Sequence, residues 1–364
     1  MAAARHTYRT SGLAATPADV ATSGTRHVGL ILSITAVGFA IAALVIALLP
    51  DDDAATSAAS GGCSVPTIAQ NELPSVVTIA VIGAAGSGTG SGEVIDDSGR
   101  VLTNNHVISA AAGGGNIEVI FNDGSSQTAH LVGRDPQTDL AVLQVPEAKG
   151  LRAIRFGSSE AIRVGQPAVA LGAPLGLSNT VTAGIVSARD RSVNVPADNG
   201  GTALLVAAIQ TDAAINPGNS GGALVDCDGK LIGIPTAGAT VPNPSGGSSA
   251  GNIGLGFAIP SEFARSIADT LIEHGSVTHG FLGLSVDTAS NGAGLYVVAV
   301  TPAGPAEAAG LDAGDLITTI DGEQARSAEQ LQELTLTHRP GETVTITYER
   351  QGATHETHLT LGSR

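Results

Sequence analysis

The sequence predicts a mainly β protein: an antiparallel barrel or sandwich, preceded by one transmembrane helix and followed by a second, smaller β-rich domain. Between residues 65 and 262, short Val/Ile/Leu runs are broken by Gly, Pro and Asn-Asp turns, with no long helical pattern between them. A long uncharged apolar run lies before this region. The chain has no Trp and few other aromatic residues, so Val, Ile, Leu and Ala must fill its core.

The N-terminal apolar run covers residues 28–49 and reads VGLILSITAVGFAIAALVIALL. It is long enough to cross the roughly 30 Å hydrocarbon core of a bilayer. Arginines precede it and aspartates follow it, which places residues 1–27 in the cytoplasm as a disordered tail and the rest of the chain outside. A cleaved signal peptide is the alternative, but its apolar core is usually only about 7–15 residues long. We expect a single-pass anchor in the cell membrane, followed by a flexible linker over residues 50–64.

Charge and cysteine usage narrow the possible partners. The formal net charge is −16, and the sequence has no block of Lys and Arg, which excludes nucleic acid as a partner. The two cysteines, Cys63 and Cys227, fit no zinc site, and we expect neither a metal nor a cofactor. Outside the cytoplasm the two thiols can oxidise, so we predict a Cys63–Cys227 disulfide that ties the end of the linker to the next domain. Two unrelated buried thiols are the alternative.

Two domains follow the linker. Residues 65–262 form the predicted β domain. A helical pattern begins near Ser261, with a glycine stop expected at Gly275, and we interpret residues 263–279 as a helix and linker. Residues 280–364 form the second domain.

Ser220 lies in the stretch INPGNSGGAL, which is either an ordinary glycine-rich turn or a turn that presents a nucleophile. A nucleophilic serine needs a base and an orienting carboxylate. Of the nine histidines, His106 stands out because it ends a strand in VLTNNHVI, and Asp139 begins one in DPQTDLAVLQV. The order His106, Asp139, Ser220 within one β domain is a known arrangement for acyl transfer on paired barrels.

The same stretch also fits the G-x-S-x-G nucleophile elbow of the α/β-hydrolases. That elbow requires a helix directly after the serine. Here the chain continues as GGALVDCDGKLIGI, whose glycines and Asp-Cys-Asp-Gly turn predict a hairpin. The elbow is therefore rejected.

Four motifs together carry a resemblance to a known family: GSGTGSGEVIDDSGRVLTNNHVI, DPQTDLAVLQV, LGAPLGLSNTVTAGIVSARDR and QTDAAINPGNSGGALVD. Over residues 72–362 the chain resembles the HtrA/DegP-like serine proteases with a C-terminal PDZ domain, especially the membrane-anchored bacterial members. The resemblance implies a chymotrypsin/trypsin-like double β-barrel followed by a PDZ domain.

The resemblance implies a role for each residue of the predicted active site. Ser220 is the nucleophile, His106 the general base and then general acid, and Asp139 the group that fixes the imidazole tautomer. The backbone N–H groups of Gly218 and Ser220, with Asn219 between them, form the oxyanion hole.

Two further positions bear on specificity. Ala214, six residues before the serine, stands where trypsin-like enzymes carry an Asp, so the S1 pocket is neutral and cleavage is expected after small or medium aliphatic residues. Pro235 replaces the Asn that the family usually has in GINTA, and proline removes a backbone donor. Fine specificity and loop switching are therefore open at this position.

In the C-terminal domain, Leu282-Gly283-Leu284 resembles the PDZ loop that captures a C-terminal carboxylate. Ser327 and Gln330 form a capping box that begins a helix, which resembles the other wall of the peptide groove. A purely structural β-rich cap is the alternative.

These features together predict a membrane-anchored, extracytoplasmic serine endopeptidase that acts on misfolded or selected envelope proteins. Its PDZ domain would bind peptide C-termini. A chaperone or scaffold with a resting protease site is the main alternative, and an esterase is a third. The resemblance also implies a homotrimer, although the aromatic contacts that often hold such trimers have no counterpart between Phe39 and Phe121.

Overall fold

The computed structural model describes residues 62–363, apart from 147–149, 174–178, 198–201 and 239–253. The predicted cytoplasmic tail, the transmembrane helix and most of the linker lie outside the described residues. Within the part that is described, no helix is long and apolar enough to cross a membrane.

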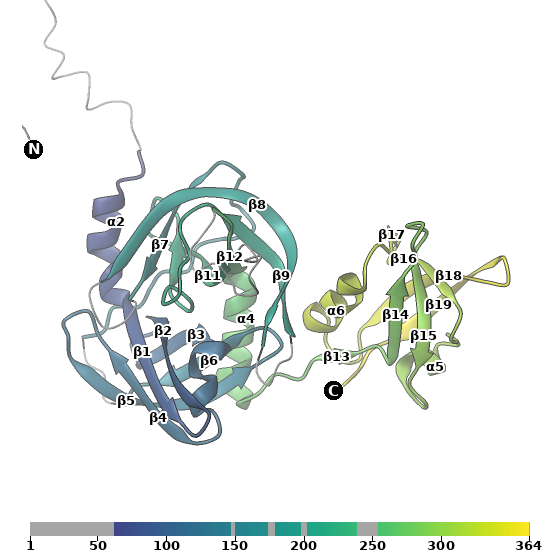
Figure 1. Ribbon diagram of the computed structural model, residues 1–364, viewed down its shortest axis with the longest axis horizontal. Helices are drawn as coiled ribbons and strands as arrows, with labels where there is room; N and C mark the ends of the chain where they lie inside the picture. The colour runs from purple at the N-terminus through teal and green to yellow at the C-terminus, as the bar shows by residue number, and fades with distance from the viewer. Residues whose placement is uncertain (1–61, 147–149, 174–178, 198–201, 239–253, 364) are drawn as a thin grey trace, which may run out of the picture. The chain divides into compact units, whose positions relative to one another are not determined.

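The first half of the predicted β domain is a closed antiparallel barrel with the strand order β1-β2-β3-β6-β5-β4 (Figure 1). A short α-helix, α3 (Asn105–Ile108), and a 3-10 turn, η3 (Ser109–Ala111), connect β3 to β4. Valine and isoleucine side chains fill the interior of this barrel. Its strands are β1 (Val76–Gly83), β2 (Gly86–Val94), β3 (Arg100–Asn104), β4 (Gly115–Ile120), β5 (Ser126–Asp135) and β6 (Leu140–Gln144).

The second half closes another barrel, with the order β10-β11-β12-β9-β8-β7. The hairpin predicted after Ser220 is present, since β10 pairs antiparallel with β11, and no helix follows the serine directly. This observation confirms the rejection of the hydrolase elbow. The strands are β7 (Pro167–Gly172), β8 (Thr180–Pro196), β9 (Thr202–Thr211), β10 (Ala223–Val225), β11 (Leu231–Gly238) and β12 (Gly256–Pro260).

One hydrophobic cluster joins the two barrels. It contains Leu102 and Leu140 from the first barrel, and Leu171 and Leu205 from the second. Helix α4 (Ser261–His274) closes this cluster with Leu271 and ends at Gly275 in the left-handed conformation that the sequence predicts. The predicted double-barrel fold class is confirmed.

The predicted disulfide is also present and joins Cys63 to Cys227, across a sequence separation of 164 residues. Cys63 directly precedes the short helix α2 (Val65–Glu72) and the 3-10 turn η2 (Leu73–Ser75), which lead into β1. Cys227 lies in the turn between β10 and β11. The bond therefore anchors the start of the described chain to the hairpin that follows the serine turn.

The C-terminal domain is a β-sheet with the order β14-β15-β16-β18-β19, in which β17 also pairs with β16, and it carries a separate small pair, β13-β20. The predicted capping box is formed by Ser327 and Gln330 at the start of α6. The elements are β13 (Gly280–Phe281), β14 (Leu284–Thr288), β15 (Leu295–Val300), α5 (Pro305–Ala308), β16 (Leu316–Ile320), β17 (Glu323–Gln324), α6 (Ala328–Thr337), β18 (Thr343–Arg350), β19 (Ala353–Thr360) and β20 (Gly362–Ser363).

Glu93 on β2 is a buried acid that the sequence did not single out. Its Cα partners, Val76 and Leu102, both belong to the cluster between the barrels. Its side chain is fully buried, and neither carboxyl oxygen has a hydrogen-bond partner among the described residues. Burial raises the pKa of Glu93 well above its usual range, so the folded protein holds this acid in its neutral form.

We expect Glu93→Gln to stabilise the protein increasingly as pH rises. An acid whose pKa is raised by folding binds a proton in the folded state that the unfolded chain has released. The unfolding free energy of the wild type therefore falls by up to about 1.4 kcal/mol per pH unit from about pH 4.3 up to the folded pKa. The side-chain amide of the Glu93→Gln variant does not ionise, so the unfolding free energy of the variant does not fall in this way.

Urea unfolding followed by circular dichroism between pH 4 and 8 measures the effect. Glu160→Gln, at an exposed position of the same domain, is the matched control. A difference between Glu93→Gln and wild type that does not change with pH would contradict the assignment of a neutral, buried Glu93.

Candidate active site

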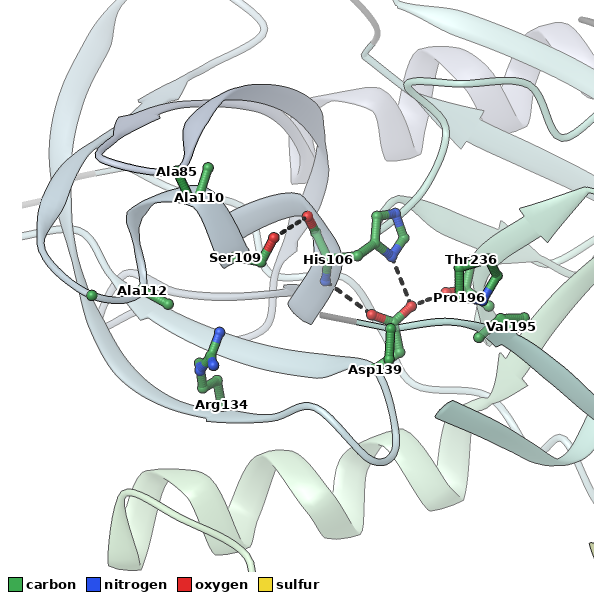
Figure 2. A pocket seen from close by; sticks show the side chains of 12 residues that line it. Ala85, His106, Ser109, Ala110, Ala112, Arg134, Asp139, Val195, Pro196 and Thr236 are labelled. Atoms are coloured by element: carbon green, nitrogen blue, oxygen red, sulfur yellow. Dashed lines mark hydrogen bonds and ion pairs between the residues drawn. The ribbon is translucent and has the colours of Figure 1, made fainter. Parts of the chain in front are cut away.

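The structure brings His106, Asp139 and Ser220 together from three separate connections. His106 lies on α3 directly after β3, Asp139 directly precedes β6, and Ser220 lies in the turn between β9 and β10. His106 Nδ1 is 2.8 Å from Asp139 Oδ2 (Figure 2). When Nδ1–H donates to this carboxylate, Nε2 is left as the acceptor that a general base requires.

Asp139 is held by its backbone as well as by its side chain. Its φ of 59° lies in the left-handed region, which is unusual for a residue other than glycine. Its carbonyl accepts hydrogen bonds from Asn104 Nδ2 at 2.9 Å and from the Asn105 N–H at 3.0 Å. Its Oδ1 accepts the His106 backbone N–H at 2.9 Å, and its Oδ2 accepts the Thr236 hydroxyl at 2.5 Å. These contacts hold a backbone conformation that is unfavourable on its own.

The Ser220 hydroxyl donates to the Thr236 carbonyl at 3.3 Å. Among the described residues, no hydrogen bond joins this hydroxyl to the His106 imidazole. Catalytic hydrogen bonds are often long or misaligned without substrate and form only in the complex. Activation of Ser220 by His106 would require Oγ to turn from the Thr236 carbonyl toward Nε2.

Ser91 on β2 shapes the serine turn from the first barrel. Its hydroxyl donates to the Gly218 carbonyl at 2.6 Å and accepts the Ala173 N–H at 2.8 Å. Its backbone N–H donates to the Ser220 carbonyl at 2.9 Å. Both carbonyls are thereby directed toward β2.

The backbone donors of this turn fall into two groups. The Asn219 N–H donates to the Asn216 carbonyl at 3.0 Å. Among the described residues, the N–H groups of Gly218 and Ser220 have no backbone acceptor. Gly218 adopts a φ of +102°, which favours glycine. Among the described residues, the Gly218 and Ser220 N–H groups are therefore left without a backbone acceptor, whereas the Asn219 N–H is engaged within the turn.

Gly221 shows why the turn requires a second glycine. Its φ is +80°, and a Cβ at this position would overlap the Ser91 carbonyl oxygen and Thr103 Oγ1. Its N–H donates to the Pro235 carbonyl at 2.9 Å. The close approach of the turn to β2 and β3 thus depends on the missing side chain.

The remaining predicted residues lie in two other places. Ala214 is half-buried, and its carbonyl accepts hydrogen bonds from Thr182 Oγ1 at 3.0 Å and from Asn219 Nδ2 at 3.1 Å. In the C-terminal domain, Leu282, Gly283 and Leu284 line a cavity of about 340 Å³ together with residues of α6.

A cavity of about 800 Å³ opens beside His106 (Figure 2). Asp139 and Thr236 line it with His106. The other lining residues include 109, 110, 112 and 113, after α3, and residues 195–197, where β8 ends. Among the residues that the structure describes, no group of His, Cys, Asp or Glu side chains can hold a metal ion.

Sequence reasoning missed Thr236 and Ser91. Thr236 follows Pro235 in GIPTA, where the proline is the residue that departs from the family pattern. Ser91 is one of several small residues in GSGTGSG. Their positions next to the residues of recognised motifs were the available signal, since neither residue type is distinctive alone.

Family models match both domains. A model described as a trypsin-like peptidase domain matches residues 90–234, and a PDZ domain model matches residues 280–361. The chain is 42% identical over 306 residues to the serine protease PepD of Mycobacterium tuberculosis, covering 82% of this chain and 66% of that protein. It is 43% identical over 285 residues to a probable periplasmic serine protease do/HhoA-like of Haemophilus influenzae, covering 75% of this chain and 58% of that protein.

Solved structures agree with these matches. The HtrA-type protease AlgW with tripeptide aligns with a TM-score of 0.67 and 38% identity, covering 83% of this chain and 97% of that chain. The serine endoprotease from Yersinia pestis aligns with a TM-score of 0.63 and 33% identity, covering 84% and 100% of the two chains. The chain spans 53% to 66% of the length of the first curated relatives that it matches.

We expect Thr236→Val to slow the reaction of Ser220 with a fluorophosphonate probe. The valine keeps the side-chain shape and the backbone carbonyl but removes the hydroxyl that donates to Asp139. A hydrogen bond to a charged group is typically worth about 1.5–3 kcal/mol, so labelling should be at least about tenfold slower. The measurement is the labelling rate at pH 8, with the melting temperature recorded for each variant.

Thr236→Ser, which restores a donor, is the control and should label at close to the wild-type rate. Equal labelling rates for Thr236→Val and the wild type would show that the reactivity of Ser220 does not depend on the hydrogen bond from Thr236 to Asp139.

Proposed function

Because the chain belongs to the HtrA-type family of trypsin-like serine proteases with a C-terminal PDZ domain, we propose that it is a serine endopeptidase that cleaves unfolded or selected proteins. The observation that carries the proposal is the 2.8 Å contact between His106 Nδ1 and Asp139, next to the turn that presents Ser220. A base oriented by a carboxylate and placed beside a serine hydroxyl is the arrangement that acyl transfer requires.

In this proposal Ser220 Oγ attacks the peptide carbonyl while His106 Nε2 accepts its proton. The same imidazole, now charged and stabilised by Asp139, returns the proton to the leaving amine. The Gly218 and Ser220 N–H groups bind the oxyanion. Loss of one such donor typically costs about 2.7–4 kcal/mol of transition-state stabilisation.

Substrate selection would occur at two places. At the S1 pocket, Ala214 contributes no charge, which favours small or medium aliphatic residues at P1, the residue whose carbonyl is attacked. In the PDZ domain, the Leu282-Gly283-Leu284 loop and α6 line one cavity, which supports capture of a peptide C-terminus there.

The proposal places the protease and PDZ domains outside the cytoplasm, anchored through residues 28–49. The Cys63–Cys227 disulfide supports an oxidising compartment, and the Haemophilus influenzae relative is described as a probable periplasmic serine protease. Assembly into a homotrimer remains a prediction from the family resemblance.

We expect the purified full chain to cleave casein, mainly after aliphatic residues, and Ser220→Ala to lower the rate by at least about a thousandfold. Mass spectrometry of the products identifies the P1 residue. Ser125→Ala, in the exposed turn between β4 and β5, is the matched control and should cleave normally.

Cleavage by Ser220→Ala at the wild-type rate would contradict the role of Ser220, and preferred cleavage after Arg or Lys would contradict the neutral S1 pocket. If neither protein cleaves but both suppress aggregation of the unfolded substrate, the chaperone alternative is correct.

A labelled peptide with a free C-terminus should bind the PDZ domain at least about tenfold more tightly than its C-terminal amide, because the amide lacks the carboxylate that the loop would hold. Gly283→Ala should weaken binding of the free acid, since Gly283 has a φ of +75° and an added Cβ would lie 3.0 Å from Pro305. Fluorescence anisotropy gives both affinities.

Gly352→Ala is the matched control for backbone strain. Gly352 also has a positive φ, of +79°, but an added Cβ there would meet open space. Equal binding of the acid and the amide would favour the purely structural role of this domain.

A further inference from the structure

Ser91 is a fully buried residue at the point where β2 meets the serine turn. Glycines flank it, and a Cβ added to Gly90 would lie 3.2 Å from the Ser220 carbonyl oxygen. A Cβ added to Gly222 would in turn lie 3.2 Å from the Ser91 Cβ. Ser91 therefore carries the only side chain of residues 90–92, and it packs directly against the turn.

The direction of the Ser91 hydroxyl is fixed by its partners. Its oxygen accepts the Ala173 N–H at 2.8 Å, and a carbonyl can only accept, so the hydroxyl donates to Gly218 at 2.6 Å. Thr78, the Cα partner of Ser91 on β1, donates its own hydroxyl to the Ala173 carbonyl at 2.7 Å. The donor that reaches Gly218 is therefore itself held in position by neighbouring backbone.

Ser91 holds two peptide units of the turn, one on each side of the unit that carries the Ser220 N–H. Its hydroxyl binds the carbonyl of Gly218, in the unit between residues 218 and 219. Its backbone N–H donates to the carbonyl of Ser220 at 2.9 Å, in the unit between residues 220 and 221. The Gly218 N–H lies on the far side of the first held unit, at a residue whose φ of +102° is reached by few residues besides glycine. The contacts of Ser91 therefore restrain the backbone that separates the Gly218 N–H from the Ser220 N–H.

We propose that Ser91 is a positioning residue for the oxyanion hole, which acts through the turn and not by contact with the substrate. It would keep the Gly218 and Ser220 N–H groups at the spacing that the tetrahedral intermediate requires. The proposal rests on the proposed function, in which these two groups bind the oxyanion. Donors that are oriented in advance stabilise the transition state more than the bound substrate, so loss of the Ser91 hydroxyl should lower kcat and leave KM nearly unchanged.

Ser91→Ala in the full chain tests this role with a fluorogenic peptide that has an aliphatic P1. Loss of one complete oxyanion donor typically lowers kcat by about 10²–10³, and Ser91→Ala leaves both donors present but less restrained. We therefore expect kcat to fall at least about tenfold, with KM within about twofold of the wild-type value. Titration of the reactive serine normalises kcat to the fraction of enzyme that is folded and reactive.

A peptide trifluoromethyl ketone with the same P1 residue isolates the oxyanion, because its adduct with Ser220 carries a negative oxygen at the same position. Its inhibition constant should rise by about the factor by which kcat/KM falls. The pH profile of kcat/KM reports the titration of the base in the free enzyme. Its midpoint should not change, since the Ser91 hydroxyl bonds to backbone groups and Asp139 keeps its contact with His106.

Ser261→Ala is the matched control. Ser261 is also fully buried in the protease domain, and its hydroxyl donates to the Gly157 carbonyl at 3.2 Å, at the start of α4. Its kcat should stay at the wild-type value. Ser91→Cys keeps a weaker donor at the same position, so its kcat should lie between those of Ser91→Ala and the wild type. Melting temperatures identify a variant that does not fold, and if Ser91→Ala is one, the same measurements on Ser91→Cys decide the question.

The positioning role is overturned by a wild-type kcat in Ser91→Ala, by a lower kcat without a higher inhibition constant, or by an equal loss in Ser261→Ala. Failure of the proposed function appears separately, as an absence of cleavage by the wild type, and would overturn both proposals.

Discussion

The Asp139 carboxylate is the contact on which the geometry of the site depends. It accepts the backbone N–H and the Nδ1 side of His106 from its own barrel, and the Thr236 hydroxyl from β11 of the other barrel. One group therefore orients the imidazole and also joins the two barrels. A movement of one barrel against the other would reach the imidazole through Thr236 and Asp139, so the apolar cluster between the barrels helps to hold the imidazole in place.

Strand β2 provides further polar contacts between the barrels, and it shows two different outcomes for buried polar groups. Ser91 and Glu93 are two residues apart, so their side chains leave the strand on the same face. Ser91 has partners for its hydroxyl and shapes the serine turn. Glu93 has none among the described residues and is held neutral by burial. Among the described residues, no hydrogen bond compensates the burial of the Glu93 carboxyl group.

Sequence reasoning reached the fold class and brought forward His106, Asp139 and Ser220 because these residues stand in ordered motifs within one β domain, although none of them is distinctive alone. The disulfide was predictable for a similar reason, since the chain contains only two cysteines. Thr236 could not be found in this way. Its contact with Asp139 depends on a bulge in β11, which decides where the side chain points but leaves no distinctive residue pattern.

Pro235 illustrates how a departure from the family pattern is accommodated. It lies in β11 where the pairing with β12 shifts register between Pro235 and Ala237, and a bulge is a position where a strand tolerates the missing N–H. The serine turn takes acceptors from this segment: the Pro235 carbonyl receives the Gly221 N–H, and the Thr236 carbonyl receives the Ser220 hydroxyl. Proline removes neither acceptor. Thr236 is the residue without a Cα partner at this register shift, and its hydroxyl donates a hydrogen bond to Asp139. The proline is compatible with the site because none of these contacts uses a backbone N–H at position 235.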